Sequence, residues 1–136
     1  MKNNFTNHLE SLALKELGFD EPCLAFYKND LTFQNQFDFE HDNEEAFVIQ
    51  NSKINPLKAV CTAPLYSQAF KFFKNKYNLH QHLQPIYSSH EWEYVILDIN
   101  WGEDKEVHYN CRKGEFITEE EAKLACLQKL IELCKK

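Results

Sequence analysis

Glycine and proline are scarce in this chain, which has three Gly and four Pro among 136 residues. Such a composition argues against a disordered segment or a repeat array. No apolar run approaches the roughly 18 residues that a membrane-spanning helix needs, and the first ten residues lack the apolar centre of a signal peptide. We therefore expect one compact domain over residues 1–136 that stays in the cytoplasm and has no membrane partner.

Catalytic and cofactor motifs are also missing. The sequence contains no GxSxG, P-loop, GxGxxG or HExxH pattern, so we expect no cofactor. His108 and Cys111 could suggest a thiol with its base, but three-residue spacing on a strand places them on opposite faces. Catalysis would need several polar groups to converge in one pocket, drawn from His80, His82, His90, Asp98, His108 and Cys111. We regard an enzyme as the least supported class.

Paired cysteines are a further absence. The five cysteines form no CxxC motif, and an odd number cannot all be bridged internally. Reduced thiols are the expected state. Cys126 and Cys134, eight residues apart, are expected near one face of a helix as small apolar side chains.

Excess positive charge is lacking too, because the formal net charge is −6. A chain of this sign repels a phosphate backbone, which makes nucleic-acid binding an unlikely function. The acidic stretch at 38–45 lacks the spacing and the glycine of an EF-hand, and it is expected to be a solvated loop.

The most informative segment that is present covers residues 62–79. Thr62 can cap a helix and Pro64 suits its first turn. One side of this helix is apolar, with the lysines displaced from it. The apolar side comprises Tyr66, Ala69, Phe70, Phe73 and Tyr77, and the lysines are Lys71, Lys74 and Lys76. A helix this aromatic needs a surface to cover, and neighbouring strands are the obvious candidates.

The first half of the chain predicts a helix followed by strands. Asn7 and Glu10 resemble a capping box, and Gly18 supplies the stop, after which Phe19 can fold back on the last turn. The apolar stripe of this helix comprises Leu9, Leu12, Ala13 and Leu17. Residues 23–27 form a buried-type strand, and residues 31–34 alternate as its hairpin partner. Strand character returns at 46–50, and residues 58–61 lead into the central helix as a short strand or an extended segment.

The second half predicts three strands and a last helix. Strands are expected at 83–87, 91–99 and 106–111, with 91–99 central because both of its faces carry apolar residues. Thr118 and Glu121 form a capping box for the last helix. The predicted fold is α+β, with the order α-βββ-α-βββ-α and a mostly antiparallel sheet covered by the central helix.

Three segments of the chain resemble a known group. They are ALKELGFDEPC at 13–23, APLYSQAFKFFKNKY at 63–77 and EEAKLACLQKLIEL at 120–133. Together they resemble uncharacterised small proteins encoded by phages, prophages and mobile elements of Bacteroidetes-type bacteria, in which a Trp usually stands at the position of Phe72. The resemblance implies a bacterial cytoplasm and an accessory role that adjusts a host process, and it implies no activity, cofactor or catalytic residue.

Aromatic residues exceed what one helix stripe needs. Such a surplus can anchor a protein partner or stack a base. The candidate contact residues are Tyr66, Lys71, Phe72, Lys76, Trp92 and Trp101. Phe72 lies about 100° from Phe73 around the helix, so it either flanks the core or is exposed.

Two function hypotheses follow from these residues. The first is a non-enzymatic interaction module that binds a host protein, a phage protein or a second copy of itself. The alternative is a protein that binds or sequesters a small ligand such as a nucleotide, with aromatic rings on the base and Lys71, Lys74 or Arg112 on the phosphate.

A metal site is the remaining possibility. His80 and His82 stand two residues apart, and alternate residues of a strand point the same way, so two imidazoles there could share an ion. His90 or His108 would have to complete the set, and solvent-facing histidines are the favoured interpretation.

Overall fold

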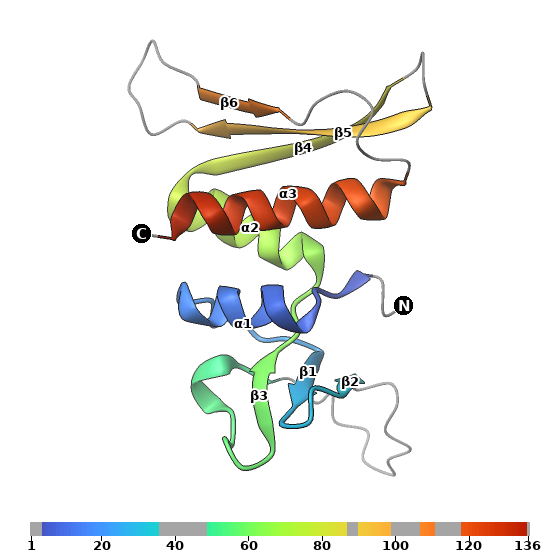
Figure 1. The fold of residues 1–136 in the computed structure, drawn as a ribbon. Coiled ribbons are helices and arrows are strands. Elements are labelled where there is room, and N and C mark those ends of the chain that lie inside the picture. The colour runs from blue at the N-terminus through green and yellow to red at the C-terminus, as the bar shows by residue number, and fades with distance from the viewer. Residues whose placement is uncertain (1–3, 36–48, 87–89, 99–106, 111–117, 136) are drawn as a thin grey trace. The chain divides into compact units, whose positions relative to one another are not determined.

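The computed structural model describes residues 4–35, 49–86, 90–98, 107–110 and 118–135, and for 107–110 it describes the backbone alone (Figure 1). Two compact units divide the chain, the N-terminal unit Met1–Gln68 and the C-terminal unit Ala69–Lys136, and each is described by itself. The order of elements is the predicted α-βββ-α-βββ-α, with one additional 3₁₀ turn, and the class is α+β. The predicted single domain over 1–136 stays a prediction.

The sheet of the N-terminal unit has three antiparallel strands in the order β2-β1-β3. They are β1 (Ala25–Lys28), β2 (Phe33–Asn35) and β3 (Ala59–Thr62). Tyr27 pairs with Phe33, which confirms the predicted hairpin. In its turn, Leu31 has a φ of 68°, and the Asp30 carboxylate accepts a hydrogen bond from the Thr32 N–H at 3.0 Å. This side-chain acceptor stabilises a turn that lacks glycine.

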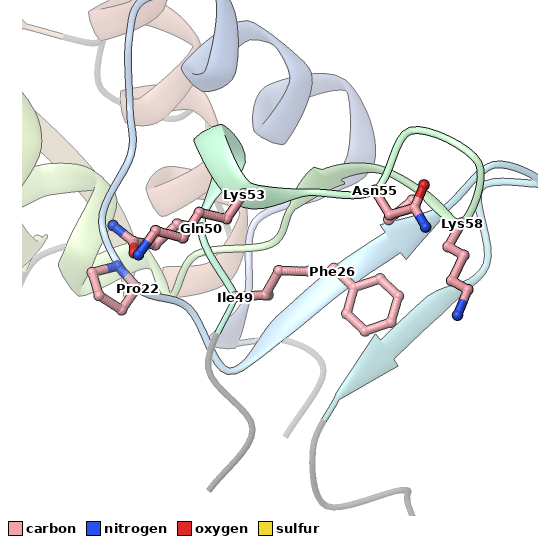
Figure 2. Close-up of a pocket in the computed structure, with 8 residues that line it drawn as sticks. Pro22, Phe26, Ile49, Gln50, Lys53, Asn55 and Lys58 are labelled. Carbon is pink, nitrogen blue, oxygen red and sulfur yellow. The ribbon is translucent and has the colours of Figure 1, made fainter.

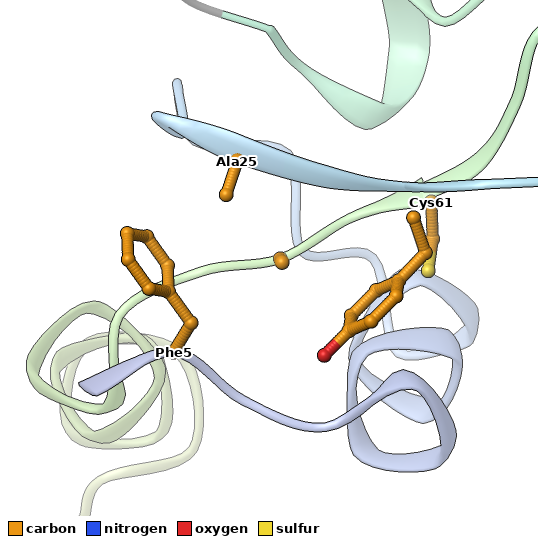
Figure 3. Packing of buried hydrophobic residues seen from close by; sticks show 5 residues of the cluster. Phe5, Ala25 and Cys61 are labelled. Carbon is orange, nitrogen blue, oxygen red and sulfur yellow. The ribbon is translucent and has the colours of Figure 1, made fainter. Parts of the chain in front are cut away.

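Alternation along β1 separates the two faces of this sheet. Ala25 and Tyr27 are buried, whereas Phe26 between them is only half-buried on the other face. The buried face forms a core with Phe5, Cys61 and Ala63, and Figure 3 shows Phe5, Ala25 and Cys61 directed into this space. Helix α1 (His8–Glu16) packs against β3. The opposite face of β1 is therefore free to line a pocket.

Two predictions for the start of helix α1 are wrong, and the prediction for its end is confirmed. Asn7 occupies the N-cap position, but its side chain makes no capping hydrogen bond, and Glu10 is turned into the unit and buried. Leu9, predicted on the apolar stripe, is 65% exposed, because the buried side of α1 runs through Glu10 and Leu14 instead. At the other end Gly18 has a φ of 98° and Phe19 is buried, so the glycine stop and the returning ring are confirmed.

Helix α2 (Tyr66–Tyr77) begins later than the predicted cap. Thr62 belongs to β3 rather than to a helix N-terminus. The Gln68 side chain takes the capping role, since its Oε1 accepts a hydrogen bond from the Leu65 N–H at 3.0 Å while its Nε2 donates to the Pro22 carbonyl at 2.8 Å. Gln68 thus fixes the entry to α2 against the segment that leads into β1.

The C-terminal unit contains a second antiparallel sheet in the order β4-β5-β6. Its strands are β4 (Leu79–Ile86), β5 (Glu91–Asp98) and β6 (Val107–Asn110), and β5 is central as predicted. Strand β4 begins four residues earlier than predicted, because Asn78 at a φ of 56° reverses the chain directly after α2. Pro85 is tolerated because β4 is an edge strand of this sheet.

Helix α3 (Glu119–Cys134) packs against β5 and β4, as Figure 1 shows. Its predicted cap is confirmed, since the Thr118 hydroxyl accepts a hydrogen bond from the Glu121 N–H at 3.2 Å. Cys126 is buried among its apolar residues, as predicted, and Cys134 is half-buried. The sequence predicted that the central helix alone covers the sheet. The contacts show that α3 covers the second sheet, which was not predicted. None of the helices in the described ranges is long and apolar enough to cross a membrane.

Candidate functional site

Two of the four predicted aromatic contact residues are buried, one is half-buried, and one lies outside the described residues. Tyr66 in the N-terminal unit is 8% exposed, and Phe72 in the C-terminal unit is 9% exposed. The Phe72 ring packs edge-on against Phe73 and Tyr77, with centroids 5.4 and 5.9 Å away. Of the two positions considered for Phe72, the structure therefore shows the one that flanks the core. Trp92 on β5 is half-buried, and Trp101 lies outside the described residues.

The predicted basic side of α2 is exposed. Lys71, Lys74 and Lys76 are all exposed, and the Lys76 ammonium lies 5.5 Å from the Phe72 centroid and 5.4 Å from the Tyr77 centroid. A cation over an aromatic face is attracted by the electron density of the ring. Lys76 therefore covers the aromatic cluster of α2, and Phe72 is not an open contact residue.

His80 and His82 alternate on β4, as predicted, with His82 exposed and His80 half-buried. The Nε2 atom of His80 lies 3.1 Å from the Asn78 side-chain carbonyl oxygen. Within the described ranges, no group of three or more His, Cys, Asp or Glu side chains is placed to hold a metal ion. The side chains of His108 and Cys111 lie outside those ranges, so the expectation that they lie on opposite faces of a strand stays a prediction.

The buried thiols are suited to packing rather than to nucleophilic chemistry. Burial raises the pKa of Cys23 to about 11, against a smaller opposite effect of the Thr62 hydroxyl, and it raises the pKa of Cys61 to about 11. Cys134 has a pKa of about 11 for the same reason, with a further contribution from the Asp98 charge. Because the thiolate is the nucleophile, the raised pKa disfavours the reactive form of all three side chains at neutral pH.

A pocket that the sequence did not suggest lies on the outer face of the N-terminal sheet. It has a volume of about 470 Å³, within the range of small-ligand sites. One wall is the half-buried face of β1, and the other is the segment 49–59 that precedes β3 (Figure 2). All of its lining residues belong to the N-terminal unit.

Backbone and amide hydrogen bonds hold the segment 49–59 over the sheet. Ile49 and Cys23 exchange a pair of hydrogen bonds, 2.8 Å from the Cys23 N–H and 2.9 Å from the Ile49 N–H. Asn51 opens the 3₁₀ turn η3 (Asn51–Lys53), and its side-chain amide donates to the Phe19 carbonyl at 2.8 Å and accepts from the Thr62 N–H at 2.9 Å. These bonds anchor the N-terminal end of the pocket wall to β3 and to the segments before β1.

The floor of the pocket is apolar. Phe26 of β1 and Ile49 lie at its centre, with Pro22 toward one end (Figure 2). Phe26 is half-buried because the core occupies the opposite side of the strand. A flat ring beside a branched aliphatic side chain offers a surface on which another planar group can stack.

Polar side chains occupy the two ends of this floor. Figure 2 shows Gln50 and Lys53 with Pro22 at one end, and Asn55 and Lys58 at the other. The Gln50 amide nitrogen donates to the Asp20 carbonyl at 2.8 Å. The Asn55 side-chain oxygen accepts from the Leu57 N–H at 3.0 Å, while its backbone carbonyl accepts from the Lys58 and Ala59 N–H groups. Each end thus combines an anchored amide with a lysine.

An acidic side chain adjoins one of the two ends. The Asp20 carboxylate accepts a hydrogen bond from the Ser52 N–H at 2.6 Å. Hydrogen bonds from the Ser52 side chain and backbone lower the pKa of Asp20, and the neighbouring Lys53 charge lowers it further. At neutral pH Asp20 is therefore an anion next to Lys53, and it offsets part of that positive charge.

Sequence reasoning missed this pocket for identifiable reasons. The run 23–27 is apolar throughout, so nothing in it distinguishes the outward Phe26 from its buried neighbours. Residues 51–61 lack a periodic pattern, and their turn residues Asn55 and Pro56 predict a loop without predicting what it covers. The lysines predicted to meet a phosphate, Lys71 and Lys74, lie on α2 in the C-terminal unit, and Arg112 lies outside the described residues.

No protein-family model, no curated protein and no solved structure matches this chain. The resemblance to proteins of phages and mobile elements accordingly stays a prediction. Function has to be argued from the chemistry of the site itself.

Proposed function

We propose that the N-terminal unit binds a small anionic molecule that carries a flat ring, such as a nucleotide or an aromatic acid, in the pocket over Phe26. The observation that supports this is the juxtaposition of an apolar floor with Lys53 and Lys58 at its two ends. It is the small-ligand alternative from the sequence, moved to a different set of residues.

The floor favours a planar group over a branched one. Phe26 is held in the middle strand of its sheet, paired with Gln34 on one side and Thr62 on the other. A ring held this way is already in place before a ligand arrives, which lowers the entropy cost of binding. Stacking of a base on an aromatic side chain contributes about 1–3 kcal/mol.

The ends favour a negative charge. Lys53 and Lys58 are both exposed, and they form a local positive site in a chain whose formal net charge is −6. Opposite charge attracts an oxyanion over a short range even where the whole chain repels it, because salt screens the distant charges more strongly. A neutral ring compound lacks this second contribution.

The test is calorimetric titration of the full chain with AMP and phenyl phosphate, with adenosine as the neutral counterpart. We expect binding of both anions, weaker binding of adenosine, and a rise of the melting temperature with saturating ligand. Phe26→Ala should weaken AMP binding about tenfold, because the stacking contribution is lost.

Lys71→Gln is the matched control, since it removes an exposed lysine from α2 in the C-terminal unit. It should leave the affinity unchanged. Equal affinity of wild type and Phe26→Ala for AMP, or the absence of binding to either anion, would contradict the proposal.

Protein interaction is the second candidate, and two exposed apolar side chains favour it. Leu9 on α1 is 65% exposed and Leu57 in the segment 49–59 is 85% exposed. Single exposed apolar residues are common, so this support is weaker than a formed pocket. Light scattering on a size-exclusion column tests self-association, which Leu9→Ser or Leu57→Ser should then reduce. A strict monomer would contradict binding to a second copy of the chain. An accessory role in a phage or mobile-element setting remains part of this candidate.

A further inference from the structure

The two ends of the pocket are not equivalent, and we infer that the Asn55 and Lys58 end holds the oxyanion of the ligand while the Gln50 end accepts a hydrogen bond from its ring. This inference rests on the proposed function. It assigns the orientation of the ligand and separates Lys58, which contacts the anion, from Lys53, which does not.

Asn55 presents a donor to the pocket because its acceptor is already used. Its side-chain oxygen accepts from the Leu57 N–H at 3.0 Å, which fixes the orientation of the amide group. The amide nitrogen is then the atom that remains for a ligand, and Figure 2 shows it on the side of Lys58. An amide N–H and an ammonium that point into one end form a binding site for a phosphate or a carboxylate.

The positive charge of Lys58 is more available to a ligand than that of Lys53, because a carboxylate lies at the Lys53 end. The Asp20 carboxylate accepts a hydrogen bond from the N–H of Ser52, the residue before Lys53, at 2.6 Å, which places this negative charge at the Lys53 end of the pocket. An oxyanion that approached Lys53 would meet the field of this fixed negative charge as well. Repulsion between like charges therefore disfavours the Lys53 end for the anionic group.

Gln50 has the complementary role. Its amide nitrogen donates to the Asp20 carbonyl at 2.8 Å, so its side-chain oxygen is the atom that remains for a ligand. An amide oxygen accepts a hydrogen bond from an amino or hydroxyl group on a ring. With Phe26 and Ile49 between the ends, a bound molecule would direct its donor group toward Gln50 and its oxyanion toward Lys58.

The experiment compares three single variants by calorimetric titration with AMP. Lys58→Gln should weaken binding about fivefold, the size expected for an exposed charged contact, and Lys53→Gln should change it less than about twofold. Asn55→Asp keeps an oxygen for the Leu57 N–H, so the turn is retained, but it replaces the donor with a negative charge. It should weaken AMP binding about tenfold or more, with a melting temperature close to that of the wild type.

Further probes separate the contributions of ring and anion. Phenyl phosphate and phenylacetate distinguish a phosphate from a carboxylate site, and both should lose affinity in Lys58→Gln but not in Lys53→Gln. Equal or larger losses in Lys53→Gln would overturn the assigned orientation and leave the proposed function intact. Failure of the wild type to bind any of the three anions would overturn both.

Discussion

At the scale of single residues, three buried hydroxyl groups form a hydrogen-bond network in the N-terminal unit. The Tyr27 hydroxyl donates to the Thr6 carbonyl at 2.7 Å, and the Thr6 and Ser11 hydroxyls lie 2.6 Å apart. Thr6 and Ser11 are fully buried, and Tyr27 is 5% exposed. Buried polar groups need such partners, because an unpaired one costs the free energy of its lost hydration. This network connects β1 to the segment that precedes α1.

Tyr27→Phe removes the donor while the ring is kept. We expect the free energy of unfolding to fall by about 1 kcal/mol, the net contribution of a typical buried hydrogen bond. Chemical denaturation with a fixed m-value measures this. Ser11→Ala, which removes a neighbouring hydroxyl of the same network, should cost a similar amount, and an unchanged denaturation midpoint in Tyr27→Phe would show that the bond contributes nothing.

Alkaline pH should destabilise the N-terminal unit through its tyrosines. Burial raises the pKa of Tyr27 and of Tyr66 to about 12, against about 10 in an unfolded chain, with smaller contributions from Cys61, Tyr66 and Glu10 for Tyr27 and from Glu10 for Tyr66. Above pH 10 the unfolded state therefore binds fewer protons than the folded state, so stability falls as pH rises and continues to fall up to about pH 12. Each tyrosine can contribute up to about 1.4 kcal/mol per pH unit in that window.

Urea denaturation at a series of pH values between 8 and 12 measures this slope. The buried thiols of Cys23 and Cys61 add a similar loss that begins near pH 9. The tyrosine contribution is isolated by comparison with Tyr27→Phe, which should show a shallower fall above pH 10. Parallel curves for the two proteins would contradict the assignment.

At the scale of elements, Asn51 is the residue that holds the pocket wall in place. Its side chain bonds to the Phe19 carbonyl and to the Thr62 N–H, residues on either side of β1 along the chain. Asn51→Ala should lower the free energy of unfolding by about 1–3 kcal/mol, since two buried backbone groups lose their partner. Hydrogen exchange should accelerate at the Thr62 amide and along 49–59.

Asn51→Asp is the informative companion variant. It keeps the acceptor for the Thr62 N–H but loses the donor to the Phe19 carbonyl. Hydrogen exchange at the Thr62 amide should therefore stay slow in Asn51→Asp, whereas it accelerates in Asn51→Ala. Ligand affinity should fall in Asn51→Ala, because the wall is no longer fixed before binding. Unchanged exchange at residues 49–59 would show that the wall is held by other contacts.

The ends of helices could be predicted from the sequence where local signals agree. The prediction failed where the outcome depended on which side of a helix becomes buried. Thr118 with Glu121, and Gly18 before Phe19, are local end signals that the structure confirms. The predicted apolar stripe of α1 is correct at Ala13, which is buried, and wrong at Leu9, because the unit buries Glu10 and leaves Leu9 exposed. Residue type alone did not reveal which side of α1 would meet β3.

At the scale of the whole molecule, the pocket could not be predicted because no spacing rule joins its parts. Phe26, Ile49 and Lys58 meet only after the segment 49–59 is anchored at Cys23 and Thr62. The net charge of −6 argued against binding of anions, but it is a property of the whole chain and not of the surroundings of two lysines. The sign of a site is set by the charges within a few ångströms, and the net charge acts over longer distances.

This difference in range predicts an unusual salt dependence for binding of AMP. The Debye length is about 30 Å at 0.01 M salt and about 10 Å at 0.1 M, so the first addition of salt screens the repulsion by the whole acidic chain more than the attraction by Lys58. Affinity should therefore stay level or rise slightly up to about 0.1 M NaCl, and fall only toward 1 M, where the Debye length is about 3 Å. Calorimetric titration across this series measures the effect, with Lys58→Gln as the variant that should lose the fall at high salt. A steep decrease of affinity from the lowest salt onward would mean that positive charge dominates at long range too, and would contradict the picture of a local cation site in an acidic molecule.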